Sequence, residues 1–366
     1  MPSSAQPGAD GGLASTQRRA LGHAAIAETL AAASTEQLVE QIESRLSASA
    51  GKAGIGAGSV LMEFAGQPVF VKLLPLSDLE LRQENLQSTA NLFELPGYFQ
   101  YGIGSVGFGA WRELAAQQQA SDWVLSQACP NFPLLHHWRV LPGLGGVLRS
   151  DEAERYFAEG SQELPGVEQV SRRFASLDEA PAHLALFIEW FPSNLRDWLH
   201  TELRHGGQRA KLGVELVERE LDQAVRFMSA QGFVHFDAHF ENMLTDGHGL
   251  YLSDFGLASC SRFELDADER QFLAEHADYD RCRSSLALVL CIVKALGGST
   301  DWRASLSDPE FLARVEACSG SVLEVLQRHA PLALAFAEFS RRLVKVSKTS
   351  AFPVAELKAL LPVFTR

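Results

Sequence analysis

Residues 235–256 read HFDAHFENMLTDGHGLYLSDFG, and this stretch decides the fold. Asp237 and Asn242 lie in one short polar segment, and a predicted hairpin then leads to Asp254. Upstream, residues 215–230 have the apolar spacing of a helix and are followed by Gln-Gly, which is typical of a helix C-terminus. A helix, a polar loop, a hairpin and a second polar loop therefore follow one another, and they bring two carboxylates and an amide together.

This order of residues resembles the catalytic loop and the Asp-Phe-Gly motif of the protein-kinase-like fold. The resemblance implies an α+β, bilobal fold with a small β-rich N-lobe and a mainly helical C-lobe. It implies that Asp237 accepts or orients the hydroxyl of an acceptor. Asn242 and Asp254 would hold Mg²⁺, because this ion prefers oxygen ligands. ATP and Mg²⁺ are then the expected cofactors, and transfer of the γ-phosphate to a hydroxyl is the expected reaction.

A glycine-rich segment precedes a predicted strand that ends near a lysine. Gly54, Gly56 and Gly58 alternate with other residues, and glycines let backbone N–H groups approach a phosphate closely. Lys72 is the only lysine between residues 53 and 210. By the resemblance, these glycines cover the nucleotide phosphates and Lys72 contacts two of them. A plain glycine linker is the alternative interpretation of the glycines.

A second glycine cluster, GIGSVGFG at residues 102–109, matches Gly-x-Gly-x-x-Gly and leads into a helix predicted over residues 110–127. It ranks second as the phosphate loop because no lysine-bearing strand follows it. Glu113 in this helix is the candidate partner of Lys72, as in kinases. The alternative is an ordinary first-turn acid that complements the helix dipole. Residues 74–101 are then an insertion.

An apolar strand predicted over residues 184–193 ends at a proline and is followed by a helix. This pattern resembles the hinge between kinase lobes. The resemblance implies that backbone groups of Glu189 and Phe191 bind the adenine ring. Any buried strand before a helix would look the same. Further along, an apolar helix begins near Asp278 and Asp280 and resembles the buried helix under the catalytic loop, so one of them would brace that loop; an ordinary acid at a helix N-terminus is the alternative.

The acceptor class is left open by two departures from the protein-kinase pattern. Phe236 stands where regulated kinases carry arginine, so no requirement for phosphorylation of the activation loop is predicted. His239 looks more like aminoglycoside and choline phosphotransferases, and no Ala-Pro-Glu motif follows. The preferred interpretation is an enzyme similar to Ser/Thr protein kinases. The alternatives are a small-molecule kinase for an antibiotic or metabolite, and a nucleotide-binding pseudokinase or regulatory scaffold.

The chain is predicted to have four regions. They are a disordered tail (1–20), an N-terminal helical extension (21–50), a nucleotide-binding N-lobe with insertions (51–190) and a helical catalytic C-lobe (191–366).

Composition limits the partners. The 366 residues carry a formal net charge of −13, which argues against binding to nucleic acid or to an anionic membrane surface. No apolar run reaches the roughly 20 residues that span a bilayer. The first residues lack the pattern of a signal peptide, and the five cysteines are scattered without a Cys-x-x-Cys pair. A cytoplasmic protein with a hydroxyl-bearing acceptor is expected, without nucleic-acid or membrane partners, and its oligomeric state is open.

Overall fold

The computed structural model describes residues 10–49, 58–102, 104–142 and 164–361. These residues divide into two compact units. Unit 1 takes those within 1–86, 117–150 and 175–190, and unit 2 takes the rest. The mixture of helices with a small antiparallel sheet confirms the predicted α+β class.

Unit 1 is built on a four-stranded antiparallel sheet with the order β1-β2-β4-β3. Ala65 and Gly66, between β1 and β2, have φ angles of 51° and 71°, which suits a tight hairpin turn. The central strand β4 is buried along nearly its whole length. The strands are β1 (Ser59–Phe64), β2 (Gln67–Leu76), β3 (Leu135–Pro142) and β4 (Ala182–Glu189).

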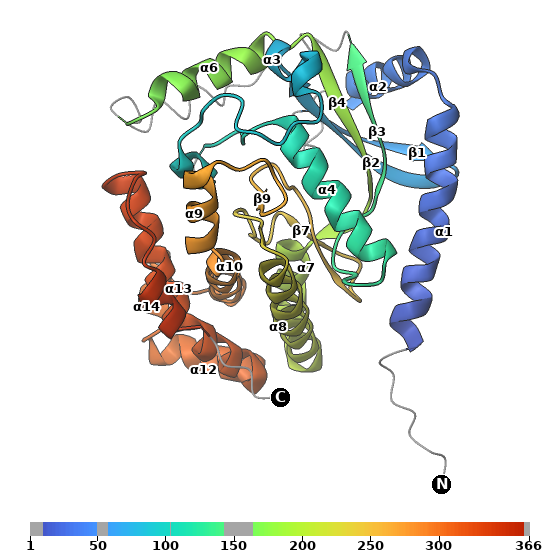
Figure 1. Ribbon diagram of the computed structural model, residues 1–366. Helices are drawn as coiled ribbons and strands as arrows, with labels where there is room; N and C mark the ends of the chain where they lie inside the picture. The colour runs from blue at the N-terminus through green and yellow to red at the C-terminus, as the bar shows by residue number, and fades with distance from the viewer. Residues whose placement is uncertain (1–9, 50–57, 103, 143–163, 362–366) are drawn as a thin grey trace. The chain divides into compact units, whose positions relative to one another are not determined.

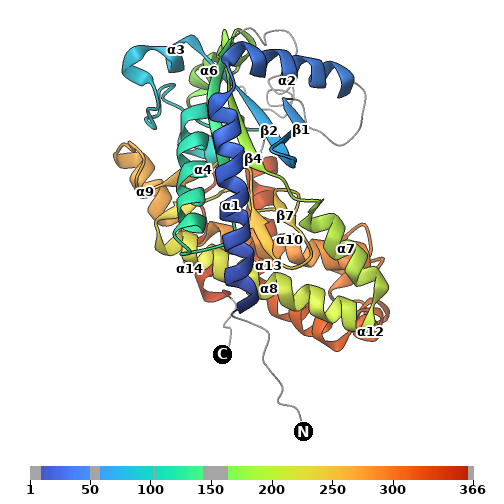
Figure 2. The same ribbon diagram turned by 90° about the vertical axis from the view of Figure 1, so that its right-hand side faces the viewer.

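The N-terminal helices α1 (Asp10–Ala32) and α2 (Thr35–Ser49) are part of the core of unit 1. Their apolar side chains belong to one buried cluster with those of the sheet, and both views show the helices beside the strands (Figures 1 and 2). The helix residues of the cluster are Ile26, Leu30, Leu38 and Ile42. The sequence predicted a disordered tail to residue 20, whereas α1 already begins at Asp10. The two helices therefore belong to unit 1 and pack against its sheet.

Unit 2 is mainly helical. Its centre is α10 (Tyr279–Ala295), a largely buried helix that packs against α8 (Gly207–Ala230) and α13 (Gly320–Lys345). Among the described residues, no helix combines the length and apolar character needed to cross a membrane. The other helices are α7 (Leu195–His205), α9 (Ala267–Glu275), α11 (Trp302–Ser305), α12 (Pro309–Cys318) and α14 (Val354–Ala359).

Short strands frame the polar loops of unit 2. The pair β6–β9 encloses both loops, and the pair β7–β8 forms the predicted hairpin between them. The strands are β5 (Ser193–Asn194), β6 (Phe233–Val234), β7 (Met243–Thr245), β8 (Leu250–Leu252) and β9 (Ser259–Cys260). This frame fixes where Asp237, Asn242 and Asp254 emerge.

Five further elements lie in the insertion or are divided between the units in sequence. The insertion after β2 contains α3 (Asp78–Leu81) and the 3₁₀ helices η1 (Gln83–Asn85) and η2 (Gly97–Gln100). Helices α4 (Ala110–Leu125) and α6 (Val167–Asp178) each contribute residues to both units.

Candidate active site

Asp280, at the start of α10, anchors the catalytic loop. Its carboxylate accepts the backbone N–H groups of His235 (2.6 Å) and Phe236 (2.9 Å). Burial raises the pKa of Asp280, and the two N–H donors act in the opposite direction. Phe236 has a φ of 62°, a strained conformation for a bulky residue, so this anchor holds a turn that would otherwise relax. Of the two acids that the sequence left open, Asp280 is the one that braces the loop.

Asp237 presents a partly open, oriented carboxylate. Its Oδ2 accepts a hydrogen bond from Nδ2 of Asn242 (2.8 Å), and Nε2 of His239 lies 3.5 Å from the same oxygen. The Asp237 side chain is 25 % exposed to solvent. The backbone is fixed as well, because the N–H of His239 donates to the carbonyl of Asp237 (2.8 Å). A held carboxylate that still faces solvent has the geometry of a group that meets an acceptor.

Asn242 and Asp254 are brought together by the residue before Asp254. The carbonyl of Asn242 accepts both the N–H (2.9 Å) and the hydroxyl (2.8 Å) of Ser253. Since Nδ2 of Asn242 donates to Asp237, the amide oxygen is the atom left to ligate a cation. Asp254 is exposed and has a φ of 66°. His235 ties the two loops together, because its Nε2 lies 2.9 Å from the carbonyl of Ser253.

This donor set fits Mg²⁺ bound together with a nucleotide. Within the described ranges, no group of three or more His, Cys, Asp or Glu is placed to hold a metal alone. Mg²⁺ commonly uses one or two protein carboxylates, and phosphates and water complete its shell. Asn242 and Asp254 supply oxygen ligands of this kind, so they suit a cation that arrives with a triphosphate.

Phe236 lies in an aromatic cluster. Its ring centroid is 5.8 Å from that of Phe272, 5.7 Å from His276 and 5.1 Å from Tyr279. Burial lowers the pKa of His276 to about 4, and its ring nitrogens contact the carbonyl of Phe272 and the hydroxyl of Tyr101, each at 2.7 Å. Apolar packing thus holds the turn where regulated kinases use arginine. That packing supports the predicted independence from loop phosphorylation, which stays a prediction.

Glu113 reaches the Asp-Phe-Gly segment from α4. It is buried, and a Cβ placed on Gly256 would lie 3.3 Å from its Oε2 and 3.5 Å from Oδ1 of Asp254. Lys72 is half-buried on β2, where it pairs in register with Ser59 and Leu186. Lys72 belongs to unit 1 and Glu113 to unit 2, so their ion pair stays a prediction.

Of the first glycine cluster, Gly54 and Gly56 lie outside the described residues. Gly58 has a φ of 84°, and its carbonyl accepts the N–H of Leu73 (2.7 Å). Gly58 is therefore placed at the start of β1, beside the strand that carries Lys72. The role of these glycines in phosphate binding stays a prediction.

Of the predicted hinge residues, Glu189 belongs to unit 1 and Phe191 belongs to unit 2. The N–H of Glu189 already donates to the carbonyl of Leu134 (2.8 Å), so this amide is engaged within the sheet. The ring of Phe191 stacks on Tyr251 at a centroid distance of 3.9 Å. Adenine binding by this segment stays a prediction, and at Glu189 it would have to use the carbonyl.

Arg19 is a contact that the sequence did not reveal. Its guanidinium donates to both carboxylate oxygens of Glu189 (2.8–3.2 Å) and to the carbonyls of Pro130 and Phe132. Helix α1 therefore braces the end of β4 inside unit 1. No periodicity or motif marks Arg19, because its partner is 170 residues away.

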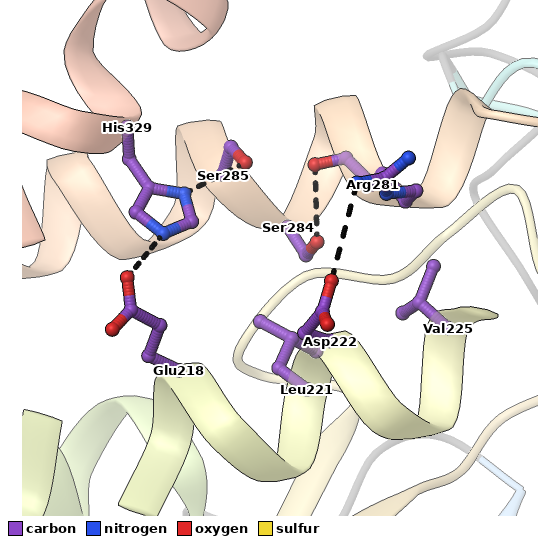
Figure 3. Close-up of a pocket in the computed structure, with 8 residues that line it drawn as sticks. All are labelled: Glu218, Leu221, Asp222, Val225, Arg281, Ser284, Ser285 and His329. Carbon is purple, nitrogen blue, oxygen red and sulfur yellow. Dashed lines mark hydrogen bonds and ion pairs between the residues drawn. The ribbon is translucent and has the colours of Figure 1, made fainter. Parts of the chain in front are cut away.

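A separate polar cluster lines a small cavity between α8, α10 and α13 (Figure 3). His329 lies between Ser285 and Glu218, with Nδ1 2.9 Å from the Ser285 hydroxyl and Nε2 3.0 Å from Oε1 of Glu218. Burial raises the pKa of Glu218, but the hydrogen bonds from His329 and Arg328 outweigh it and leave that pKa below its usual value. The cavity of about 20 Å³ has room for roughly one water molecule. Ser285, His329 and Glu218 thus form one chain of hydrogen bonds beside the cavity.

Comparison with known proteins agrees with the site. The model of the phosphotransferase enzyme family, APH, matches residues 109–267. A search of the curated proteins found no match. The matched segment includes Glu113, Asp237, Asn242 and Asp254, whereas Lys72 lies before it. The predicted bilobal, protein-kinase-like class is consistent with this match and is confirmed. Over residues 109–267 the chain is similar to this phosphotransferase family, and the resemblance predicted from the catalytic-loop residues is confirmed.

Proposed function

We propose that the chain transfers the γ-phosphate of ATP to a hydroxyl acceptor with Mg²⁺ as cofactor. The observation that supports this proposal most strongly is the arrangement of three side chains in unit 2. Asn242 donates to Asp237 and is joined through Ser253 to Asp254. This arrangement supports a division of roles in which one carboxylate meets the acceptor and two oxygen donors hold the metal.

The residues divide the work as follows. Asp237 orients the acceptor hydroxyl and takes up its proton as the new P–O bond forms, while the bond from the γ-phosphorus to the bridging oxygen breaks and ADP leaves. Asn242 and Asp254 hold Mg²⁺, which neutralises the charge on the phosphates when bound. Lys72 and the glycines of the first cluster are proposed phosphate contacts, and Glu113 is the proposed partner of Lys72. Glu189 and Phe191 are the proposed adenine-binding segment.

The acceptor is proposed to be a protein Ser/Thr hydroxyl, on the evidence of the intact Asp-Phe-Gly motif. The second candidate, a small molecule such as an antibiotic or metabolite, is favoured by His239, which lies beside Asp237, and by the family match. A pseudokinase is disfavoured because Lys72, Asp237, Asn242 and Asp254 are all present.

One assay with γ-³²P-labelled ATP tests the proposal. The protein is incubated with Mg²⁺ and a cell extract that has been separated into protein and small-molecule fractions. Label in protein supports the first acceptor class, and label in the small-molecule fraction supports the second. Binding of Mg–ATP without any transfer would instead support the pseudokinase and contradict the proposed reaction.

A further inference from the structure

The second glycine cluster lies against the catalytic residues of its own unit. A Cβ placed on Gly102 would lie 3.0 Å from Oδ1 and 3.5 Å from Cγ of Asp237, and 3.2 Å from Cδ1 of Leu257. A Cβ placed on Gly107, whose φ is 74°, would overlap the carbonyl oxygen of Gly256. Two glycines of one cluster are thus in contact with the two motifs that carry the proposed chemistry.

The surrounding insertion is fixed on the segment that follows the Asp-Phe-Gly motif. The side-chain amide of Gln100, which is buried, donates to the carbonyl of Leu257. Next to it, the Tyr101 hydroxyl lies 2.7 Å from Nε2 of His276. Gln100 and Tyr101 directly precede Gly102 in the sequence, so their hydrogen bonds fix the chain on the N-terminal side of Gly102.

A second set of bonds holds the insertion on its outer side. Arg112 donates to Oε1 of Glu269 (2.8 Å) and to the carbonyl of Thr89 (2.6 Å). The Thr89 hydroxyl accepts the N–H of Glu264 (2.9 Å), whose carboxylate accepts the hydroxyl of Ser88 (2.5 Å). The Arg112 side chain is only 3 % exposed, so this ion pair is shielded from water. Hydrogen bonds therefore fix the insertion at residues 88–89 and again at residues 100–101.

The carboxylate of Asp237 has little freedom to move away from Gly102. Its Oδ2 is held by Asn242 at 2.8 Å, and its backbone is fixed by the N–H of His239. Oδ1 is the oxygen that faces Gly102. The space around Oδ1 is therefore set by the absence of a side chain at residue 102.

We propose that Gly102 is a specificity-determining residue, which limits the size of the group that can approach Oδ1 of Asp237. Gly107 contributes by letting the insertion lie directly on Gly256. The inference rests on the proposed function, since it takes Asp237 as the group that meets the acceptor. In this proposal, the backbone at Gly102 forms one boundary of the space through which an acceptor approaches Asp237.

Gly102→Ala and Gly102→Val test the proposal because they add side chains of increasing size beside Oδ1 of Asp237. The backbone at Gly102 lies outside the left-handed region, so alanine is allowed there. Gly320→Ala is the matched control, because nothing lies within 4 Å of a Cβ at that residue. Leu257→Ala changes the same space in the opposite direction, since it removes the side chain beside Gly102.

Two measurements are made on each variant. The first is modification of Asp237 by a water-soluble carbodiimide with methylamine, read by peptide mass spectrometry, which reports access to the carboxylate without any turnover. The second is ATP hydrolysis, in which water is the acceptor, measured together with the affinity for Mg–ATP. We expect Gly102→Ala to keep its Mg–ATP affinity, while labelling and hydrolysis fall about tenfold and fall further in Gly102→Val. Leu257→Ala should raise the labelling of Asp237, and Gly320→Ala should behave as the wild type.

The outcomes separate this inference from the proposed function. Unchanged labelling of Asp237 in both Gly102 variants would overturn the proposal that Gly102 limits access to this carboxylate. Loss of folding in the Gly102 variants, seen by thermal melting, leaves Leu257→Ala to decide, and unchanged labelling there would also overturn it. If the wild type neither binds Mg–ATP nor transfers phosphate, the proposed function fails, and the labelling series still decides whether Gly102 limits access.

Discussion

Unit 2 contains two hydrogen-bonded groups of ionisable side chains that differ in exposure. In one, Asp237 is held by Asn242 and approached by His239, and a quarter of its side-chain surface stays exposed. In the other, His329 bridges Ser285 and Glu218, and the His329 side chain is 7 % exposed beside a cavity with room for one water molecule. The chemical groups are similar, but the Asp237 side chain is more exposed than that of Glu218, at 25 % against 12 %. Exposure and steric room therefore separate a candidate catalytic group from a structural one.

Asp237→Ala should have the largest effect on activity. Removal of the proposed general base is expected to lower the rate of phosphate transfer by about 10³-fold, because general-base catalysis contributes roughly that much. The initial rate of ³²P transfer at saturating Mg–ATP measures this. A rate within tenfold of the wild type would show that Asp237 is not the base. The melting temperature should stay close to that of the wild type, since the side chain is not in the core.

Asp280→Ala should affect both stability and activity. It leaves the buried N–H groups of His235 and Phe236 without their acceptor, which costs about 3 kcal/mol of unfolding free energy. Urea unfolding measures the loss, and transfer should fall as well because the turn at Phe236 is released.

Asp280→Asn is the control, since its amide oxygen can keep one of the two bonds. Its stability and rate should fall between those of the wild type and Asp280→Ala. Equal behaviour of the alanine variant and the wild type would mean that the carboxylate does not hold the loop.

These two groups also show what the sequence could predict. Asp237, Asn242 and Asp254 could be predicted because they lie close together in the sequence, in a loop and hairpin pattern that resembles the kinase motifs. Asp278 and Asp280 could not be told apart, because either suits a helix N-terminus. The contact of Gly102 with Asp237 and the bond of Arg19 to Glu189 join residues far apart in the chain. Such contacts leave no periodic pattern, so only the folded structure reveals them.

The aromatic cluster beneath the catalytic loop should make stability depend on pH. Burial lowers the pKa of His276 to about 4 from its ordinary value of 6.5, so the unfolded chain binds a proton more readily than the folded one between these values. The stabilising effect of the neutral ring is complete above pH 6.5 and is lost as the pH falls towards 4. Melting temperatures of the wild type and His276→Gln should therefore converge over this range. A constant difference would show that the ring is not buried in its neutral form.

His329→Ala should have the smallest effect, and on stability alone. Glu218 keeps its bond from Arg328, so the loss of the histidine bonds is expected to cost about 1–2 kcal/mol. Thermal melting measures the change, and the transfer rate should remain that of the wild type. His248→Ala, at an exposed histidine, is the matched control. A fall in the transfer rate without a fall in stability would contradict a purely structural role for the His329 cluster.

The roles proposed for Asp254 and Asp237 are tested by the affinity for Mg–ATP of Asp254→Ala and Asp237→Ala, measured side by side by displacement of a fluorescent ATP analogue. Asp254 is assigned to the metal and Asp237 to the acceptor, so the two losses should differ in kind. Asp254→Ala should bind Mg–ATP about 10- to 100-fold more weakly than the wild type. Asp237→Ala should bind it as the wild type does while transfer is lost. Equal affinity in Asp254→Ala and the wild type, or loss of binding in Asp237→Ala, would contradict the division of roles between the two carboxylates.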